Sequence, residues 1–246
     1  MQISRWKIIL GIILVILSII SYLIHYFIFR DSHHIFIYLI GDIAFVFLEV
    51  LLVTMIIDGV LHYREKRTMI EKLNMVVGSF FIECGTEILK FFIGFDPQRE
   101  KIGQGVIVRD NWTTKDFDSV YRFLKSYDYP VDIALGDLEG LKQLLAGQRA
   151  FLLRLLENPN LIEHESFTDL MMSLYHLMEE LVARKDILSL SKGDQKHISV
   201  DIKRAYRCLV SEWLSYMKHL KENYPYLFSF AMRTNPFDPN AQVEIE

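Results

Sequence analysis

The sequence has too few cysteines to build a disulfide-stapled domain. Only Cys84 and Cys208 occur in 246 residues, and both fall within helical patterns. A disulfide framework needs a larger, even set of cysteines at regular spacing. We therefore interpret both cysteines as reduced packing residues.

The sequence also lacks an excess of basic residues. Its 27 Lys and Arg are outnumbered by 31 Asp and Glu, which gives a net charge of −4. Nucleic-acid-binding domains usually carry a basic patch or stripe, and no such stripe dominates here. Nucleic acid is therefore not expected among the partners.

The motifs of common catalytic and nucleotide sites are missing as well. The chain contains no G-x-S-x-G, no G-x-x-x-x-G-K-[ST] and no G-x-G-x-x-G, and the "GQG" at 103–105 follows no convincing strand. Ser, His and Asp residues occur, but no pattern groups them into a catalytic set. We expect no cofactor and no enzymatic activity.

Metal ligands are present but poorly arranged. The stretches "EHES" and "YHLMEE" supply the candidates His164, Glu165 and His176. Helical di-iron proteins use Glu-x-x-His on inward faces, usually twice, whereas here the order is reversed in His176-x-x-Glu179 and has no second copy. A helical wheel puts His176 on the polar side of its helix. The expectation is therefore that no metal site exists, with these three residues as the candidates if one does.

Apolar residues make up 51% of the chain and are concentrated in residues 8–62. Ile8–Phe29 is 22 residues without a charge, which as a helix spans about 33 Å and exceeds the roughly 30 Å hydrocarbon core of a bilayer. A second apolar run, Ile35–Val60, follows the connector "RDSHH". A cleaved signal peptide fits poorly, because the first run is too long and no small-x-small site follows it. Residues 1–62 are predicted to form a transmembrane hairpin with spans at about 8–29 and 35–61.

The distribution of Lys and Arg predicts the orientation of this hairpin. Basic residues flank the outer ends of both spans, while the connecting loop has only Arg30; they are Arg5, Lys7, Arg64, Lys66, Arg67 and Lys72. Positive residues favour the cytoplasmic side. We expect a protein of the inner (plasma) membrane with both termini in the cytoplasm.

Two carboxylates interrupt the second span. Asp42 and Glu49 are seven residues apart, so they share one face of a helix. An antiparallel fold about residue 33.5 would place His25 opposite Asp42, Ser18 opposite Glu49, and Gly11 in close approach to the second span. An acid at mid-membrane costs about 2.5–3.5 kcal/mol unless it is paired, protonated or hydrated. The alternatives are pairing within the hairpin, acidic rings around a shared axis of several copies, and other contacts between copies.

The remainder reads as an all-α soluble region. A stalk helix at 63–95 continues the second span, with an apolar stripe that includes Leu73, Val77 and Phe80. Residues 96–112 are predicted to be a linker with one short extended piece, "GVIVR". Residues 113–234 are predicted to form a bundle of about five or six helices, and residues 235–246 an extended tail.

Local signals predict where the helices of the bundle begin and end. Thr113 or Thr114 is expected to cap the first, and Ser166 another, with Asp169 three residues later. One helix is expected to open at Gly136–Asp137 and run to Pro159. "KGDQ" at 192–195 is predicted to be a turn, and Pro225 to start the last helix.

Four phrases of the sequence resemble an uncharacterised group of prokaryotic two-span membrane proteins. They are "YLIGDIAFVFLEVLLVTMIID", "REKRTMIEKLNMVVGSFF", "HESFTDL" and "YPYLFSFAMRTNPF", and they run from the second span to the tail. The resemblance implies that hairpin and bundle belong to one unit. It implies no activity and no site residue.

Three functional hypotheses follow. The first is a non-enzymatic, oligomeric scaffold or sensor in the bilayer, whose cytosolic helical domain contacts other copies or a cytosolic protein. The second is a homo-oligomeric cation or proton channel lined by the second span, with Asp42, Glu49, Ser18 and His25 as the intramembrane polar residues. The third is a membrane-anchored metal-dependent enzyme with its site around His164, Glu165 and His176.

Overall fold

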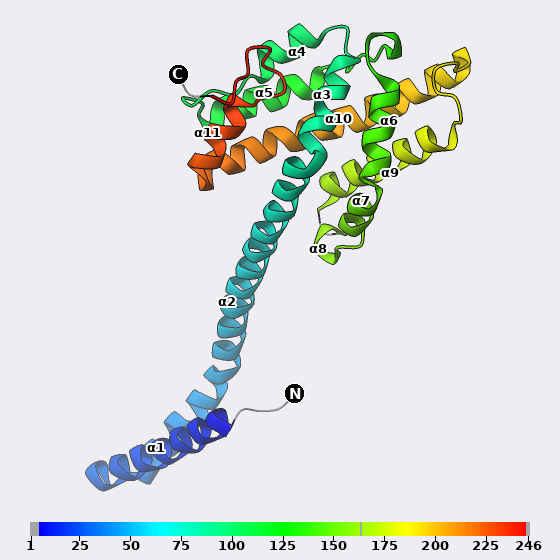
Figure 1. The fold of residues 1–246 in the computed structure, drawn as a ribbon. Helices are drawn as coiled ribbons and strands as arrows, with labels where there is room; N and C mark the ends of the chain where they lie inside the picture. Colours follow the sequence, from blue (N-terminus) through cyan, green and yellow to red (C-terminus); the bar gives the residue numbers. More distant parts are fainter. Residues whose placement is uncertain (1–4, 163, 245–246) are drawn as a thin grey trace. The chain divides into compact units, whose positions relative to one another are not determined.

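The computed structural model describes residues 5–162 and 164–244, and every regular element within them is a helix. The all-α prediction is therefore confirmed for the described chain (Figure 1). The chain divides into two compact units, with the boundary between Lys66 and Arg67. We describe the two units separately and call the second one the helical domain.

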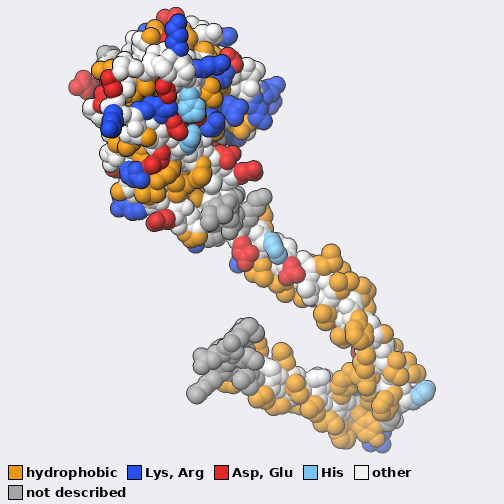
Figure 2. Space-filling model, turned by 90° about the vertical axis from the view of Figure 1, so that its right-hand side faces the viewer, with side chains coloured by type: hydrophobic (Ala, Val, Ile, Leu, Met, Phe, Trp, Pro, Cys, Tyr) orange, Lys and Arg blue, Asp and Glu red, His pale blue; other side chains and the backbone are white. Residues whose placement is uncertain are grey.

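Two apolar helices make up the N-terminal unit. Helix α1 is Arg5–Phe29, and α2 is Ser32–Phe80, whose first part belongs to this unit. The stretches Ile9–Phe29 and Ile35–Glu65 are long and apolar enough to cross a membrane, and the most apolar window of each is 0% buried. Figure 2 shows hydrophobic side chains over much of the coloured surface of this unit. The predicted spans are thus present as apolar helices, while a bilayer crossing stays a prediction.

The predicted close packing of the hairpin is wrong. A Cβ added to Gly11 would meet nothing within 4 Å, so this glycine does not mark a close approach of two helices. Asp42 and Glu49 form no hydrogen bond or ion pair with any described residue, so neither His25 nor Ser18 pairs with them. Figure 2 shows α1 and α2 spreading apart from the turn that joins them. The predicted register assumed parallel axes, and the diverging helices do not meet that condition.

The helical domain is assembled around its longest helix, α10. This helix packs against α9, α5, α3 and α11, and a single cluster of buried apolar side chains runs through the domain. The helices after α2 are α3 (Thr86–Gly94), α4 (Arg99–Val106), α5 (Thr114–Ser126), α6 (Leu138–Gly147), α7 (Arg149–Leu156), α8 (Pro159–Ile162), α9 (Glu165–Ala183), α10 (Lys192–Asn223) and α11 (Pro225–Arg233).

A π-helical turn interrupts the predicted stalk. Helix α2 ends at Phe80, residues Phe81–Gly85 form the π-helix η1, and α3 continues to Gly94. The Thr86 hydroxyl donates a 2.9 Å hydrogen bond to the carbonyl of Phe81, five residues earlier. The predicted apolar stripe is confirmed at Leu73, Val77 and Phe80, all buried. The side chain of Met69, also in that stripe, lies outside the described residues.

Two segments predicted to be irregular are in fact packed. The linker prediction for 96–112 is wrong, because α4 occupies its centre and buries Ile102 and Val106. The expected extended piece "GVIVR" overlaps the end of that helix and forms no strand. The extended-tail prediction for 235–246 is wrong up to Phe237. This residue is 5% exposed, and the centroid of its ring lies 5.2 Å from that of Trp213. Apolar side chains in these segments join the core and so draw the backbone onto the domain.

The predicted helix ends are partly confirmed. Thr113 caps α5, with the Asp116 carboxylate accepting from its backbone N–H and its hydroxyl, and Pro225 opens α11. The single helix predicted from 136 to 158 is wrong, since Gln148 separates α6 from α7. "KGDQ" is not a turn but the first turn of α10, because the Ser191 hydroxyl accepts from the N–H of Asp194 and caps the helix.

Candidate functional site

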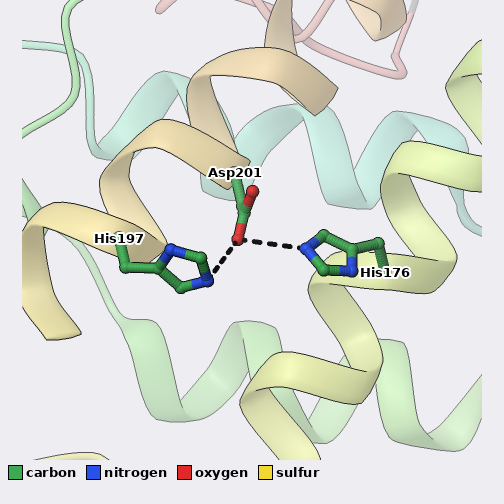
Figure 3. Close-up of side chains that lie close together, drawn as sticks. All are labelled: His176, His197 and Asp201. Atoms are coloured by element: carbon green, nitrogen blue, oxygen red, sulfur yellow. Dashed lines mark ion pairs between the residues drawn. The ribbon is translucent and has the colours of Figure 1, made fainter.

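A cluster of two histidines and a carboxylate lies between α9 and α10 (Figure 3). Each helix has a regular apolar face turned to the core, with Leu174, Leu177 and Met178 fully buried on α9 and Ile198 and Ile202 fully buried on α10. This packing holds the two helices side by side. The residues at the edge of the contact therefore face one another: His176 from α9, and His197 and Asp201 from α10.

The three side chains converge on one carboxylate oxygen. Oδ2 of Asp201 lies 3.4 Å from Nε2 of His176 and 3.3 Å from Nε2 of His197. The Asp201 side chain is 3% exposed, whereas the two imidazoles are 46% and 51% exposed. The carboxylate of the cluster is thus buried, while both imidazoles are half exposed to solvent.

The two oxygens of Asp201 have different partners. Oδ1 forms an ion pair with Arg204, whose Nη1 lies 3.2 Å away. Oδ2 has no hydrogen-bond donor among the described residues, although it is buried. A buried carboxylate oxygen without a hydrogen-bond donor is costly, and the contacts that Oδ2 makes are the ion pairs with the two imidazoles, which require these to be protonated.

A second acidic group borders the cluster. Oε2 of Glu180 lies 3.4 Å from Nε2 of His197, and Arg184 donates to the same oxygen at 2.7 Å. Arg184 also lies 3.2 Å from Asp194 at the start of α10. The hydrogen bond from Arg184 lowers the pKa of Glu180, so this group is a carboxylate at neutral pH.

The structure separates the three metal candidates suggested by the sequence. His176 is part of the cluster, but His164 is the N-cap of α9, where its Nδ1 accepts a 3.2 Å bond from the N–H of Phe167. The predicted cap at Ser166 is therefore wrong by two residues. Glu165 is exposed in the first turn of α9. Among the described residues, the cluster that contains His176 includes neither His164 nor Glu165.

Sequence reasoning missed His197 and Asp201. The turn predicted at "KGDQ" shortened α10 at its start, and nothing in the sequence indicated that this helix lies beside α9. The signal that identifies them is a pair of matching motifs: His176 and Glu180 are four residues apart on α9, and His197 and Asp201 are four apart on α10. Residues at this spacing share one face of a helix.

The four polar residues that the sequence predicts inside the membrane do not come together in the described chain. Asp42, Glu49 and Ser18 are exposed, and the ring of His25 packs 4.8 Å from that of Phe29. The two carboxylates lie on α2, and the other two residues on α1. Because α1 and α2 diverge, none of the described side chains of α1 forms a hydrogen bond or ion pair with either acid.

A further acid, Glu212, is buried inside the helical domain. Glu212 is 5% exposed and lines a hollow of about 280 Å³ together with Ser166, Arg207 and Cys208. Burial raises the pKa of Glu212, while the Ser166 hydroxyl and His164 oppose that shift. The Ser166 hydroxyl lies 3.3 Å from Nδ1 of His164 and hydrogen-bonds to Glu212, while the same Nδ1 accepts the N–H of Phe167 as the helix cap, so these groups stabilise the start of α9.

Comparison with known proteins identifies the family. The family models described as "Uncharacterized protein MJ1433, C-terminal helical domain" and "MJ1433, N-terminal helical domain" match residues 69–233 and 2–61. Uncharacterized protein MJ1433 of Methanocaldococcus jannaschii is 46% identical over 243 residues, which are 99% of this chain and 97% of the relative. The chain belongs to the MJ1433 family. No solved structure matches it.

Both units of the chain are present in the MJ1433 relative. The two family models meet between residues 61 and 69, where the structure also divides, and the relative spans both parts. The apolar helices and the helical domain therefore occur together in the MJ1433 relative, as the resemblance seen in the sequence implied. The His176, His197 and Asp201 cluster lies within the matched C-terminal domain.

Proposed function

We propose that this MJ1433-family chain is a non-enzymatic integral membrane protein that associates with copies of itself through α1 and α2. Its helical domain then acts as a scaffold or sensor at the cytoplasmic face. The observation that carries the proposal is the state of the two apolar helices: their side chains are exposed, and two of the exposed groups, Asp42 and Glu49, are acids without a hydrogen bond or ion pair to any residue that the structure describes.

Exposed apolar helices of this length support insertion into a bilayer. Burial of apolar surface contributes about 25 cal/mol per Å², so two uncovered helices of this composition are unfavourable in water. A helix satisfies its own backbone hydrogen bonds and therefore enters hydrocarbon without loss. The Lys and Arg residues at the outer ends of both helices favour cytoplasmic termini.

The two acids support association between copies. Each costs about 2.5–3.5 kcal/mol when placed alone at the centre of a bilayer helix. Asp42 and Glu49 lie two turns apart on one face of α2, so a second copy docked along that face meets both. Carboxyl groups from two copies can share a proton or a bound cation there, which removes most of the cost.

Oligomeric state in lipid tests the proposal. The full chain is reconstituted in liposomes at low density, and copies are counted by single-molecule photobleaching. We expect the wild type to be multimeric and the double variant D42L/E49L to shift toward monomers. D58L is the matched control. Asp58 also lies on α2, but near the polar end of the apolar stretch Ile35–Glu65, so this variant should leave the copy number unchanged. A wild type that is monomeric in lipid contradicts the proposal.

A second candidate function rests on the same two residues. If several copies turn the Asp42 and Glu49 face toward a common axis, the acids form rings that attract cations, as in cation channels. Planar bilayers with the reconstituted chain should then carry a cation current that falls in E49Q and persists in D58N. If the chain is multimeric but the bilayers carry no current, the channel hypothesis is rejected and the scaffold hypothesis stands.

A further inference from the structure

We propose that His176, His197 and Asp201 bind one divalent transition-metal ion, with Zn²⁺ as the best match. This inference goes beyond the proposed function, since the site lies within the helical domain and needs neither α1 nor a second copy. The argument rests on the geometry of the three ligand atoms, on the unused oxygen of Asp201, and on the two helices that hold the ligands.

The spacing of the ligand atoms matches a metal site better than a set of hydrogen bonds. Charge-assisted N–H···O bonds are about 2.7–2.9 Å long, whereas the two imidazole nitrogens lie 3.4 and 3.3 Å from Oδ2 of Asp201. Zinc bonds of about 2.0–2.1 Å, arranged tetrahedrally, place neighbouring ligand atoms about 3.3–3.4 Å apart. The observed spacing is therefore that of two edges of a zinc tetrahedron.

An ion fits between the three atoms with little movement. No two of the ligand atoms are more than 4.8 Å apart. With the two other distances at 3.3 and 3.4 Å, a point equidistant from all three atoms lies no more than about 2.4 Å from each, against roughly 2.0–2.2 Å for zinc bonds to nitrogen and oxygen. Small rotations of the two half-exposed imidazoles close that difference.

The unused oxygen of Asp201 points to a positive ligand. Oδ2 is buried, has no hydrogen-bond donor among the described residues, and is aimed at the two imidazoles. Arg204 holds the other oxygen at 3.2 Å, which fixes the orientation of the carboxylate. Groups that orient a metal-binding carboxylate in this way are typical of metal sites. A cation between Oδ2 and the imidazoles satisfies the oxygen that the protein leaves open.

The helices hold the ligands at the required spacing before any ion arrives. Asp201 is flanked by the fully buried Ile198, Ile202 and Ala205, so its position is set by the core. His197 precedes it by four residues on the same face of α10, and His176 faces both from α9. The ligand set is preformed, and binding costs little rearrangement.

The chemistry of the donors selects the metal class. Two neutral imidazoles and one carboxylate suit Zn²⁺ and its transition-metal neighbours, while Mg²⁺ and Ca²⁺ prefer oxygen alone. Because both imidazoles are half exposed, the fourth position is open to water. Glu180 stays outside the first set of ligands, since its Oε2 is engaged by Arg184.

Metal titration of the full chain in detergent tests the site. The affinity tag is removed, the protein is stripped with a chelator, and Zn²⁺ is added in competition with a chromophoric chelator. We expect one Zn²⁺ per chain, and a visible spectrum of four-coordinate Co²⁺ when Co²⁺ replaces it. H176Q and H197Q should each weaken Zn²⁺ binding on the order of 10-fold or more and change the Co²⁺ spectrum.

Matched variants make the outcome decisive. H164N removes an imidazole elsewhere in the same domain while keeping a helix cap, so it should bind Zn²⁺ as the wild type does. H176Q and H197Q carry the test because both side chains are half exposed and tolerate change, whereas D201N alters a buried group and is checked for folding by circular dichroism. A wild type that takes up no Zn²⁺, or an H176Q/H197Q variant that binds as tightly as the wild type, overturns the proposal. Neither result bears on self-association in lipid.

Discussion

The Tyr127 hydroxyl donates a 2.8 Å hydrogen bond to Oδ2 of Asp96, a carboxylate that is 1% exposed. The Tyr206 hydroxyl donates to the same oxygen at 3.3 Å, and the N–H of Gln98 donates to Oδ1 at 2.7 Å. Burial raises the pKa of Asp96, and these three bonds oppose the shift. Asp96 thereby ties the segment after α3 to α10 and to the segment after α5.

Replacement of Asp96 by alanine should strongly destabilise the helical domain. The D96A variant leaves the buried Tyr206 hydroxyl without its acceptor and the Tyr127 hydroxyl with only the carbonyl of Gln98, 3.4 Å away, at a cost of about 2–4 kcal/mol in the free energy of unfolding. Thermal melts of the full chain in detergent, followed by circular dichroism, measure the loss. D128A is the control: Asp128 pairs with Lys203 at the surface, and such pairs contribute about 0–1 kcal/mol. Equal melting temperatures for D96A and wild type would contradict the assignment.

The Asp96 network shows what the sequence alone predicts and what it does not. Apolar periodicity is a local signal, and it identified the two N-terminal helices and the buried stripe of Leu73, Val77 and Phe80 on α2. Asp96 lay in a segment read as a linker, because its partners Tyr127 and Tyr206 are 31 and 110 residues away. Only the folded chain brings such groups together.

The candidate metal cluster was missed for a similar reason. His176 was correctly placed on the polar side of α9, yet a polar face is unremarkable until its neighbour is known. The neighbour is the first part of α10, where "KGDQ" has the composition of a turn but starts a helix capped by Ser191. The cap at His164 was hidden as well, since histidine is not among the residues favoured at helix starts.

The Glu212→Gln variant should change the pH dependence of stability. Because the pKa of Glu212 is raised in the folded chain, folding favours the protonated form, and stability falls as pH rises from the unfolded value of about 4.3 through the folded pKa. E212Q removes this loss, so its melting temperature should exceed that of wild type at pH 8. The gain is on the order of 1 kcal/mol, or about 2–4 °C.

Melts of E212Q and wild type at pH 4 and pH 8 measure this effect. The difference between the two proteins should be small at pH 4, where both side chains are neutral, and larger at pH 8. E139Q is the control, since Glu139 is partly exposed at the start of α6 and shows no such burial. A difference that is constant with pH would mean that Glu212 is not the titrating group.

Gly85→Ala should destabilise the π-helical turn. A Cβ at this position would lie 2.5 Å from Cε1 of Phe80 and 2.9 Å from Cδ1 of Phe81, and both rings are buried. Phe80 is also held against Phe167, with ring centroids 5.5 Å apart, so it has little room to move. Overpacking of this kind costs about 1–3 kcal/mol.

The neighbouring glycine provides the comparison for G85A. A Cβ at Gly78 would lie 3.6 Å from the Tyr216 ring, which is an ordinary contact. Because alanine favours a helix over glycine by about 0.5–1 kcal/mol, G78A should leave the melting temperature unchanged or raise it. Thermal melts of both variants decide the point. Similar effects of the two substitutions would show that space at Gly85 is not the limiting factor.

Removal of the Phe237 ring should loosen the C-terminal segment. Phe237 is 5% exposed and packs against Trp213, and its carbonyl oxygen lies 3.1 Å from where a Cβ of Gly103 on α4 would stand. F237A should cost about 2–4 kcal/mol and raise amide hydrogen exchange in α4. V243A, at an exposed position, should leave both quantities as in wild type. Unchanged exchange in α4 for F237A would contradict the contact.

The π-helical turn at Phe81–Gly85 accommodates one extra residue in the helical run from α2 to α3. Each residue of an α-helix advances the chain by about 100°, and the wider π-turn takes up the added residue without passing that rotation on to α3. Ile88, Leu89 and Phe92 of α3 are buried in this arrangement. If the same residues wound as a regular α-helix, these three side chains would be turned by about 100° from their present direction. Deletion of one residue between 81 and 85 should therefore convert the π-turn to regular α-helix and leave α3 facing the core, whereas a further insertion there would turn its buried face away.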